Sequence, residues 1–160
     1  MLRFFADGLL VGILLVAATA GIWWLVRTRP SVTKLIPYVL MAGLSALLAG
    51  KLMSFWQPVS ERPFESLGVE AGAAYMNNPG FPSDHALLAT IVVMTLFALT
   101  PYKRLSAGLM VAVVAMCIAR VVALVHTPLD VVGGVVAGLV GALWYIRLRR
   151  DKHKGILTNN

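Results

Sequence analysis

The sequence predicts an all-α fold, an integral membrane bundle of five transmembrane helices. Hydrophobic residues make up 59% of the 160 residues and charged residues only 13%, whereas a soluble domain carries about 25% charged residues. The hydrophobic residues also come in long blocks rather than in the amphipathic stripes of a soluble core. The length fits one domain, so residues 1–160 are expected to form a single transmembrane domain.

Five apolar blocks predict the five spans, at about residues 9–26, 35–56, 86–100, 105–125 and 131–146. A membrane-spanning helix needs about 20 apolar residues. The third and fifth blocks are therefore short unless their polar ends lie in the membrane interface. One long connection, residues 57–82, precedes the third block. Within it, residues 77–80 predict a turn, and residues 67–76 are a candidate short interfacial helix.

The placement of lysine and arginine predicts the orientation of the bundle. Ten of the 14 basic residues lie in the first loop, the third loop and a basic tail at residues 147–160: Arg27, Arg29, Lys34, Lys103, Arg104, Arg147, Arg149, Arg150, Lys152 and Lys154. Five spans put these regions on one side, which the positive-inside rule makes cytoplasmic. We therefore expect the amino terminus outside and the carboxyl terminus inside. The net charge of +7 is interpreted as a topology signal, so no nucleic-acid partner is expected.

A cleaved signal peptide is the alternative interpretation of the first block. Arg3 precedes an apolar run, and Ala18-Thr19-Ala20 resembles a cleavage site. The apolar run continues to residue 26, however, and an inside amino terminus would place the basic first loop outside. We therefore expect the first span to be retained.

Three basic residues lie in or near the outward-facing segments, where topology does not account for them: Lys51, Arg62 and Arg120. Arg120 falls inside an apolar block, where a charge is costly unless it is paired or hydrated. Arginine is well suited to bidentate contact with phosphate. For Lys51 the alternative is a lysine that reaches the lipid headgroups from a helix end.

The tetrapeptide Pro82-Ser83-Asp84-His85 stands where the long loop enters the third span. Ser83 is a candidate N-cap, and the free N–H groups of a first helical turn bind anions. His85 in that turn could reach the same anion. The alternative is an ordinary helix start in which Ser83 acts only as a cap.

A second histidine lies beyond the outer end of the fourth span. Five residues separate Arg120 from His126, and three separate His126 from Asp130. Pro128 predicts a helix break between them, which would let the carboxylate fold back onto the imidazole. An aspartate bonded to one ring nitrogen leaves the other as a nucleophile or base. The alternative is an interfacial histidine beside a capping aspartate.

These segments supply the groups needed for phosphoryl transfer through a phosphohistidine. Cations hold the phosphate oxygens, one histidine attacks, and the other protonates the leaving oxygen. Two histidines and an aspartate could also ligate zinc. The neighbouring arginines would repel a metal cation, so no metal or cofactor is expected.

The three segments resemble the signature of the type 2 phosphatidic acid phosphatases, a family of membrane lipid phosphatases. The family pattern is Lys-x6-Arg-Pro, Pro-Ser-Gly-His and Ser-Arg-x5-His-x3-Asp. The resemblance covers about residues 51–141, with the motifs within 51–130. It implies that His126 is the nucleophile, that Asp130 orients it, and that His85 is the acid. It further implies a metal-independent reaction, with phosphate held by residues at the matching positions and their amides: Arg62, Arg120, Ser83, Asp84 and, in place of the motif lysine, Lys51.

This chain departs from the family pattern at several positions. Phe55 stands at the position of the motif lysine, and Lys51 lies four residues earlier. Asp84 replaces the usual glycine and Ala119 the usual serine, both as in members that act on undecaprenyl diphosphate. The family commonly has six spans, so the first is expected to be missing here.

The leading hypothesis is a phosphatase that converts undecaprenyl diphosphate to undecaprenyl phosphate, with its site at the extracytoplasmic face of the cell membrane. Phosphatidic acid, phosphatidylglycerol phosphate and lysophosphatidic acid are alternative substrates. A lipid phosphotransferase and a non-catalytic protein that binds or transports phospholipid are alternative functions. Gly134-x-x-x-Gly138 permits close helix packing, within the chain by preference or between two copies in a homodimer.

Overall fold

The computed structural model of the chain describes residues 1–56, 61–75 and 80–153. Most of the predicted turn at residues 77–80 and the tail from Lys154 lie outside the described residues. Within them every regular element is helical, which confirms the all-α membrane bundle. The elements are η1 (Phe4–Gly8), α1 (Leu9–Thr28), α2 (Val32–Trp56), α3 (Pro63–Ser66), α4 (Asp84–Leu99), α5 (Lys103–Val122), α6 (Pro128–Ala142) and α7 (Trp144–His153).

Four helical stretches are long and apolar enough to cross a membrane: Phe4–Thr28, Val32–Trp56, Lys103–Val122 and Pro128–Asp151. The fifth apolar helix, α4, has only 16 residues. The third span is thus short, as predicted. The fifth is not, because α7 continues almost directly from α6 and extends the helical stretch to 24 residues. The chain is a multi-pass membrane protein.

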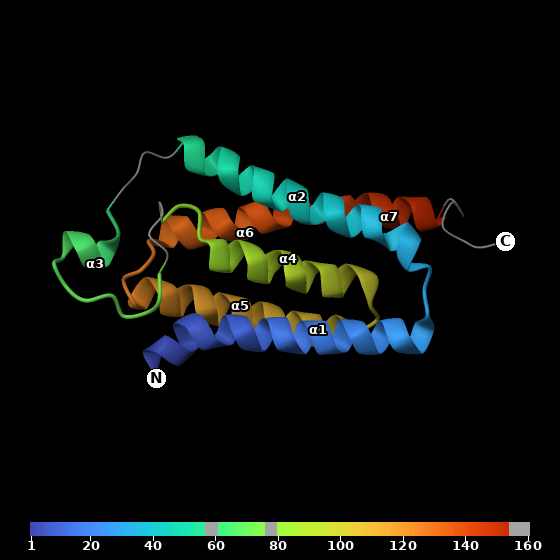
Figure 1. The fold of residues 1–160 in the computed structure, drawn as a ribbon, viewed down its shortest axis with the longest axis horizontal. Helices are drawn as coiled ribbons and strands as arrows, with labels where there is room; N and C mark the ends of the chain where they lie inside the picture. The colour runs from blue at the N-terminus through green and yellow to red at the C-terminus, as the bar shows by residue number, and fades with distance from the viewer. Residues whose placement is uncertain (57–60, 76–79, 154–160) are drawn as a thin grey trace.

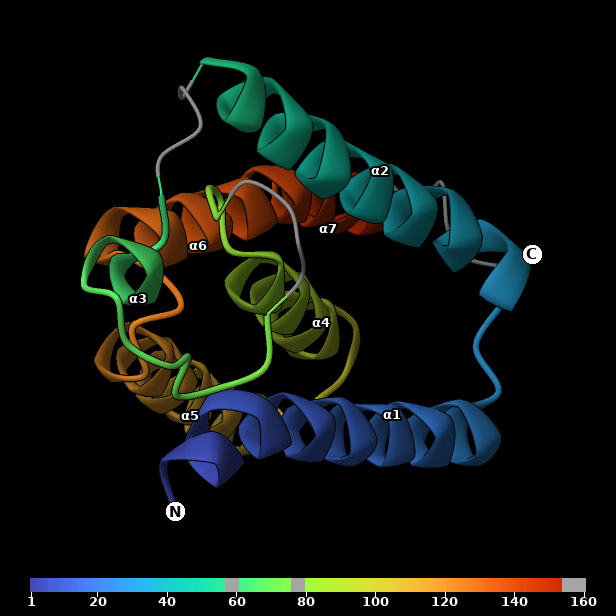
Figure 2. The same cartoon turned by 60° about the vertical axis from the view of Figure 1, so that its left-hand side comes forward.

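Helix α4 lies at the centre of the bundle. Figures 1 and 2 show α1 and α2 on opposite sides of α4, and α4 also packs against α5 and α6. The amino terminus and α3 lie at one end of the bundle, where α4 and α6 begin, and α7 extends to the opposite end (Figure 1). The segments that carry the motifs therefore meet at the end of the bundle that holds the amino terminus.

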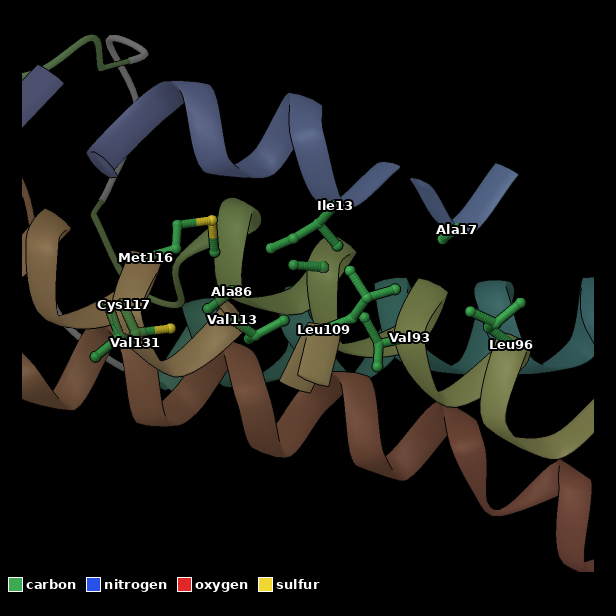
Figure 3. Packing of buried hydrophobic residues seen from close by; sticks show 11 residues of the cluster. Ile13, Ala17, Ala86, Val93, Leu96, Leu109, Val113, Met116, Cys117 and Val131 are labelled. Atoms are coloured by element: carbon green, nitrogen blue, oxygen red, sulfur yellow. The ribbon is translucent and has the colours of Figure 1, made fainter. Parts of the chain in front are cut away.

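The apolar core around α4 is formed by side chains from four helices. Ile13 of α1, Val93 of α4, Val113 and Met116 of α5 and Val131 of α6 are all buried in one cluster (Figure 3). Burying each such side chain contributes about 1.5–3 kcal/mol relative to an exposed one in water. Because the outer faces of these helices are also apolar, apolar character alone does not determine which face of each helix points into the bundle, as it would in a soluble protein.

Three glycines of α6 allow the close approach of its neighbours. A Cβ on Gly134 would lie 2.4 Å from the Ser83 carbonyl oxygen, and one on Gly138 3.0 Å from a main-chain oxygen of α4. A Cβ on Gly141 would lie 2.3 Å from the Ala42 carbonyl oxygen of α2. The Gly134-x-x-x-Gly138 pattern thus packs helices within the chain, as preferred from the sequence.

The long loop after α2 contains a helix at a different place from the one predicted. Residues 67–75 form turns and irregular chain, and the helical turn lies at Pro63–Ser66 instead. Pro63 occupies the first helical position, which suits its fixed φ. The Arg62 N–H donates to the Glu65 carboxylate over 2.8 Å, which ties the start of the helix to its first turn. Proline and glutamate together determine this helix start.

The predicted orientation can be tested by cysteine labelling. We expect a membrane-impermeant thiol reagent to label Glu61→Cys in the outer loop of intact cells, and Arg150→Cys in α7 only after permeabilisation, because the basic loops mark the cytoplasmic side. The native cysteine, Cys117, is buried and is replaced by alanine as background. Labelling of the α7 variant from outside intact cells would overturn the orientation.

Candidate active site

A narrow pocket lies where the long loop, the start of α4 and the end of α5 meet. Its lining comes from these segments and from the α5–α6 connection: Arg62, Gly80, Pro82, Asp84, His85, Arg120 and His126. Five of the eight predicted site residues therefore line one pocket. Ser83 and Asp130 are buried beside it, whereas Lys51 lies elsewhere.

The connection between α5 and α6 positions the second histidine. Helix α6 begins at Pro128 with Thr127 as its N-cap. The Asp130 N–H donates to Thr127 Oγ1 over 3.2 Å, and the Thr127 N–H donates to Asp130 Oδ2 over 2.7 Å. This reciprocal pair is a capping box. It holds the carboxylate so that Asp130 Oδ2 lies 3.4 Å from His126 Nδ1.

The same carboxylate lies beside Nδ1 of the His126 ring. An aspartate at Nδ1 favours a proton there and leaves Nε2 with its lone pair. Both side chains are buried, His126 at 5% and Asp130 at 6% exposure. Within the described part of the chain, His126 Nδ1 has no hydrogen-bond partner other than this nearby carboxylate. The helix break predicted at Pro128 thus brings the two groups together.

Ser83 connects the second motif to the third. It occupies the N-cap position of α4, but its side chain makes no capping hydrogen bond. Its main-chain N–H donates to the Asp130 carbonyl oxygen over 2.9 Å. The fully buried Ser83 Oγ finds no partner among the described residues. An unpaired buried hydroxyl costs about 1–3 kcal/mol, so the interpretation of Ser83 as only a helix cap does not account for it.

His85 and Asp84 lie in the first turn of α4. The helix begins at Asp84, so its first N–H groups face the end of the bundle at which the pocket lies. His85 is half-buried and Asp84 exposed. Both line the pocket together with His126. Two imidazoles from different segments therefore meet at one cavity, as a nucleophile and an acid require.

Arg62 reaches the pocket from the long loop. Its side chain is 6% exposed, and Nη1 donates to the Val125 carbonyl oxygen over 2.6 Å. The guanidinium also lies over the Tyr75 ring, 5.4 Å from its centroid. The Phe64 N–H donates to the Leu124 carbonyl oxygen. The loop is thus fixed to the α5–α6 connection, which brings Arg62 beside the third motif.

Arg120 is almost completely buried in the last turn of α5, at 1% exposure. A charge in an apolar block needs a counter-charge, and for Arg120 Asp7 provides it. Arg120 Nη1 donates to Asp7 Oδ1 over 2.8 Å, and Nη2 donates to the Ala74 carbonyl oxygen over 3.0 Å. The sequence motifs did not identify Asp7. The available signal was an acidic residue at the amino-terminal end of the first span, which lies at the same end of the bundle as Arg120.

Lys51 is not brought to the pocket. It is exposed on α2 and does not line the cavity. Phe55, at the position of the motif lysine, is 88% exposed. The structure therefore gives no support to the predicted phosphate contact of Lys51, and its exposure on α2 fits the alternative of a lysine that reaches the lipid headgroups.

The chain is similar to proteins of a known family. Residues 8–154 match the PAP2 superfamily. The chain is 31% identical over 143 residues to the Escherichia coli (strain K12) protein YbjG, which is named provisionally as an undecaprenyl-diphosphatase. It is 30% identical over 127 residues to the bacitracin transport permease protein BcrC of Bacillus licheniformis. These alignments cover 88% and 77% of this chain, and 68% and 59% of the relatives.

No solved structure matches the chain significantly. The family match extends over nearly the whole chain and includes all three motifs. The chain therefore belongs to the PAP2 superfamily, which confirms the resemblance to the type 2 phosphatidic acid phosphatases and makes it a phosphatase.

Proposed function

We propose that this phosphatase hydrolyses undecaprenyl diphosphate to undecaprenyl phosphate through a phosphohistidine on His126. The observation that carries the proposal is the pocket at which His85, His126, Arg62 and Arg120 meet, with Asp130 3.4 Å from His126. The choice of lipid is supported by the name of the relative YbjG and by Asp84 in the second motif.

In the first step, His126 Nε2 attacks the terminal phosphorus. The bond from this phosphorus to the bridging oxygen breaks, and His85 donates a proton to that oxygen of the leaving undecaprenyl phosphate. The Asp130 carboxylate stabilises the positive charge that develops on the His126 ring. Arg62 and Arg120 offset the charge on the equatorial oxygens, the task that Mg²⁺ performs in other phosphoryl-transfer sites.

In the second step, His85 accepts a proton from water, and the water oxygen attacks the phosphohistidine. The bond from phosphorus to His126 Nε2 breaks, inorganic phosphate leaves, and both histidines return to their starting states. No atom changes its oxidation state in this step. The only co-reactant is water.

A lipid substrate is supported by the surface of α4. His85, Leu88, Val92 and Leu99 follow one face of this helix at spacings of three, four and seven residues, over about 21 Å. Leu88 is 41% exposed. Val92 and Leu99 line an apolar groove of about 600 Å³ between α1, α2 and α4. An isoprenoid chain on this face would remain in an apolar environment while its diphosphate reached His85.

A non-catalytic role in lipid transport is the second candidate function. It is favoured by Phe55 in place of the motif lysine, and the name of the relative BcrC, a bacitracin transport permease protein, supports transport without naming a lipid. Transport alone does not require a carboxylate behind a buried histidine. That pairing favours catalysis.

Phosphate release from a substrate panel tests the proposal. Purified protein should remain active in EDTA, because arginines supply the positive charge in the site. It should release phosphate from undecaprenyl diphosphate faster than from phosphatidic acid or phosphatidylglycerol phosphate. Among the described residues, no three His, Cys, Asp or Glu side chains are grouped to hold a metal ion.

Each contrary outcome of the panel is informative. Loss of activity in EDTA, with recovery on adding a divalent ion, would remove the phosphohistidine mechanism. A preference for phosphatidic acid or phosphatidylglycerol phosphate would replace the substrate but keep the enzyme class. Binding of the diphosphate lipid without phosphate release would favour the transport function.

A further inference from the structure

Asp7 connects three segments that lie far apart in the chain. It belongs to η1, the helical turn that precedes α1. Its Oδ1 accepts from Arg120 Nη1 over 2.8 Å, and its Oδ2 accepts from the Ala74 main-chain N–H over 3.0 Å. One carboxylate therefore joins the amino-terminal turn, the last turn of α5 and the outer loop.

These contacts use the two Nη atoms of the Arg120 guanidinium. A guanidinium has five N–H donors, two on each Nη and one on Nε. Nη1 donates to Asp7 and, over 3.4 Å, to the Ala6 carbonyl oxygen, and Nη2 donates to Ala74. Among the described residues, Nε has no partner. The N–H of Nε and one of the two N–H groups of Nη2 are thus left without a described acceptor, and guanidinium N–H groups of this kind bind phosphate oxygens.

Asp7 itself does not line the pocket, whereas Arg120 does. The Asp7 side chain is 30% exposed and that of Arg120 2%. The Asp7 carboxylate thus lies outside the pocket lining, and any effect that it has on the reaction passes through Arg120. Since a buried unpaired charge is strongly unfavourable, Asp7 also offsets the cost of burying this arginine.

We propose that Asp7 is a positioning residue, which fixes Arg120 so that its remaining N–H groups face the transferring phosphoryl group. This inference rests on the proposed function and adds a residue from outside the three motifs. Asp7 has a second effect of opposite sign, because its negative charge weakens the attraction of the pocket for anions. Loss of Asp7 should therefore slow the chemical step without weakening the binding of phosphate.

The Asp7→Asn variant tests the proposal. Asparagine keeps the shape, but its amide nitrogen cannot accept a bond from Arg120 or Ala74. We expect kcat to fall about 10–100-fold, since a small misplacement of a site group has effects of this size. The inhibition constant of inorganic phosphate should stay equal or become tighter. Asp7→Glu, which keeps the charge, should recover part of kcat.

Two controls separate positioning from folding. Glu70→Gln removes another exposed carboxylate from the outer loop and should leave kcat unchanged. In an Arg120→Lys background, assayed with a reactive aryl phosphate, Asp7→Asn should change kcat less than about threefold, because residues that act through one another are not additive.

The outcomes distinguish this inference from the function on which it rests. Wild-type protein that releases no phosphate from any lipid would overturn both. An active wild type with a folded Asp7→Asn variant of unchanged kcat would overturn only the role of Asp7. So would a fall of kcat, phosphate affinity and melting temperature together, because that pattern indicates loss of structure.

Discussion

Replacing His126 with alanine should abolish hydrolysis of every phosphate substrate, lipid or aryl. The expected loss is on the order of 10⁴-fold or more, as for the removal of other nucleophiles, because the proposed attacking nitrogen is lost with the ring that lies 3.4 Å from the Asp130 carboxylate. Alkaline quenching of wild-type protein with ³²P-labelled substrate should trap a phosphoenzyme that is stable in base and labile in acid. The His126→Ala variant should trap none.

His85→Ala should behave differently because the proposed acid acts on the leaving group. Loss of a general acid costs about 10²–10⁴-fold, and the loss should shrink when the leaving group needs no proton. An aryl phosphate with an acidic phenol should therefore partly rescue His85→Ala but never His126→Ala. Rescue of His126→Ala instead would reverse the two roles.

A matched control for both variants is His153→Ala. His153 ends α7, at the end of the bundle away from the motifs (Figure 1), so its loss should leave turnover unchanged. If all three histidine variants kept wild-type turnover, the pocket would not be the active site.

The parts of the fold that the sequence predicts are those determined by local patterns. A long apolar run allows only a helix in a membrane, since every main-chain polar group must be satisfied internally. The blocks at 35–56 and 105–125 therefore correspond to α2 and α5 within a few residues. Pro128 likewise determines a helix start through its fixed φ, and the capping box places Asp130 beside His126 without help from distant residues.

Features that depend on tertiary contacts were not predictable. The basic residues after 146 indicated the end of the fifth span, yet α7 continues as a helix because Tyr145 and Leu148 are buried while Arg147 and Arg149 remain exposed. The partner of Arg120 lies 113 residues away in the chain. No spacing rule relates the two residues, and only a requirement for charge balance could have suggested Asp7.

Ser83 shows how tertiary contacts override a local preference. Serine before a helix is expected to cap it through its hydroxyl. Here the Ser83 N–H donates to the Asp130 carbonyl oxygen, and the Ser83 carbonyl oxygen lies against Gly134. The position of Ser83 is therefore determined by α6, and its hydroxyl is left without a bond to α4.

Replacing Gly134 of α6 with alanine should displace the start of α4, which carries the second motif. The new Cβ would lie 2.4 Å from the Ser83 carbonyl oxygen, 2.8 Å from Ala86 Cβ and 3.1 Å from the Leu87 nitrogen. Two of these atoms belong to the backbone and cannot rotate away, so the start of α4 must move from α6. We expect stability to fall by about 1–3 kcal/mol, as for other overpacked sites, and kcat by about 10²-fold through misplacement of the second motif.

Two other glycines serve as controls that separate stability from catalysis. At Gly108 of α5, a Cβ would meet no described atom within 4 Å apart from its chain neighbours and the backbone of its own helix. Gly108→Ala should keep full activity and gain about 0.5–1 kcal/mol from reduced backbone entropy of the unfolded chain. Gly141→Ala would place Cβ 2.3 Å from the Ala42 carbonyl oxygen, at the α2–α6 contact. It should lower the melting temperature as Gly134→Ala does, but retain kcat in the folded fraction. Equal losses of kcat in the Gly134 and Gly141 variants would indicate that α6 supports the whole bundle and does not position Ser83 in particular.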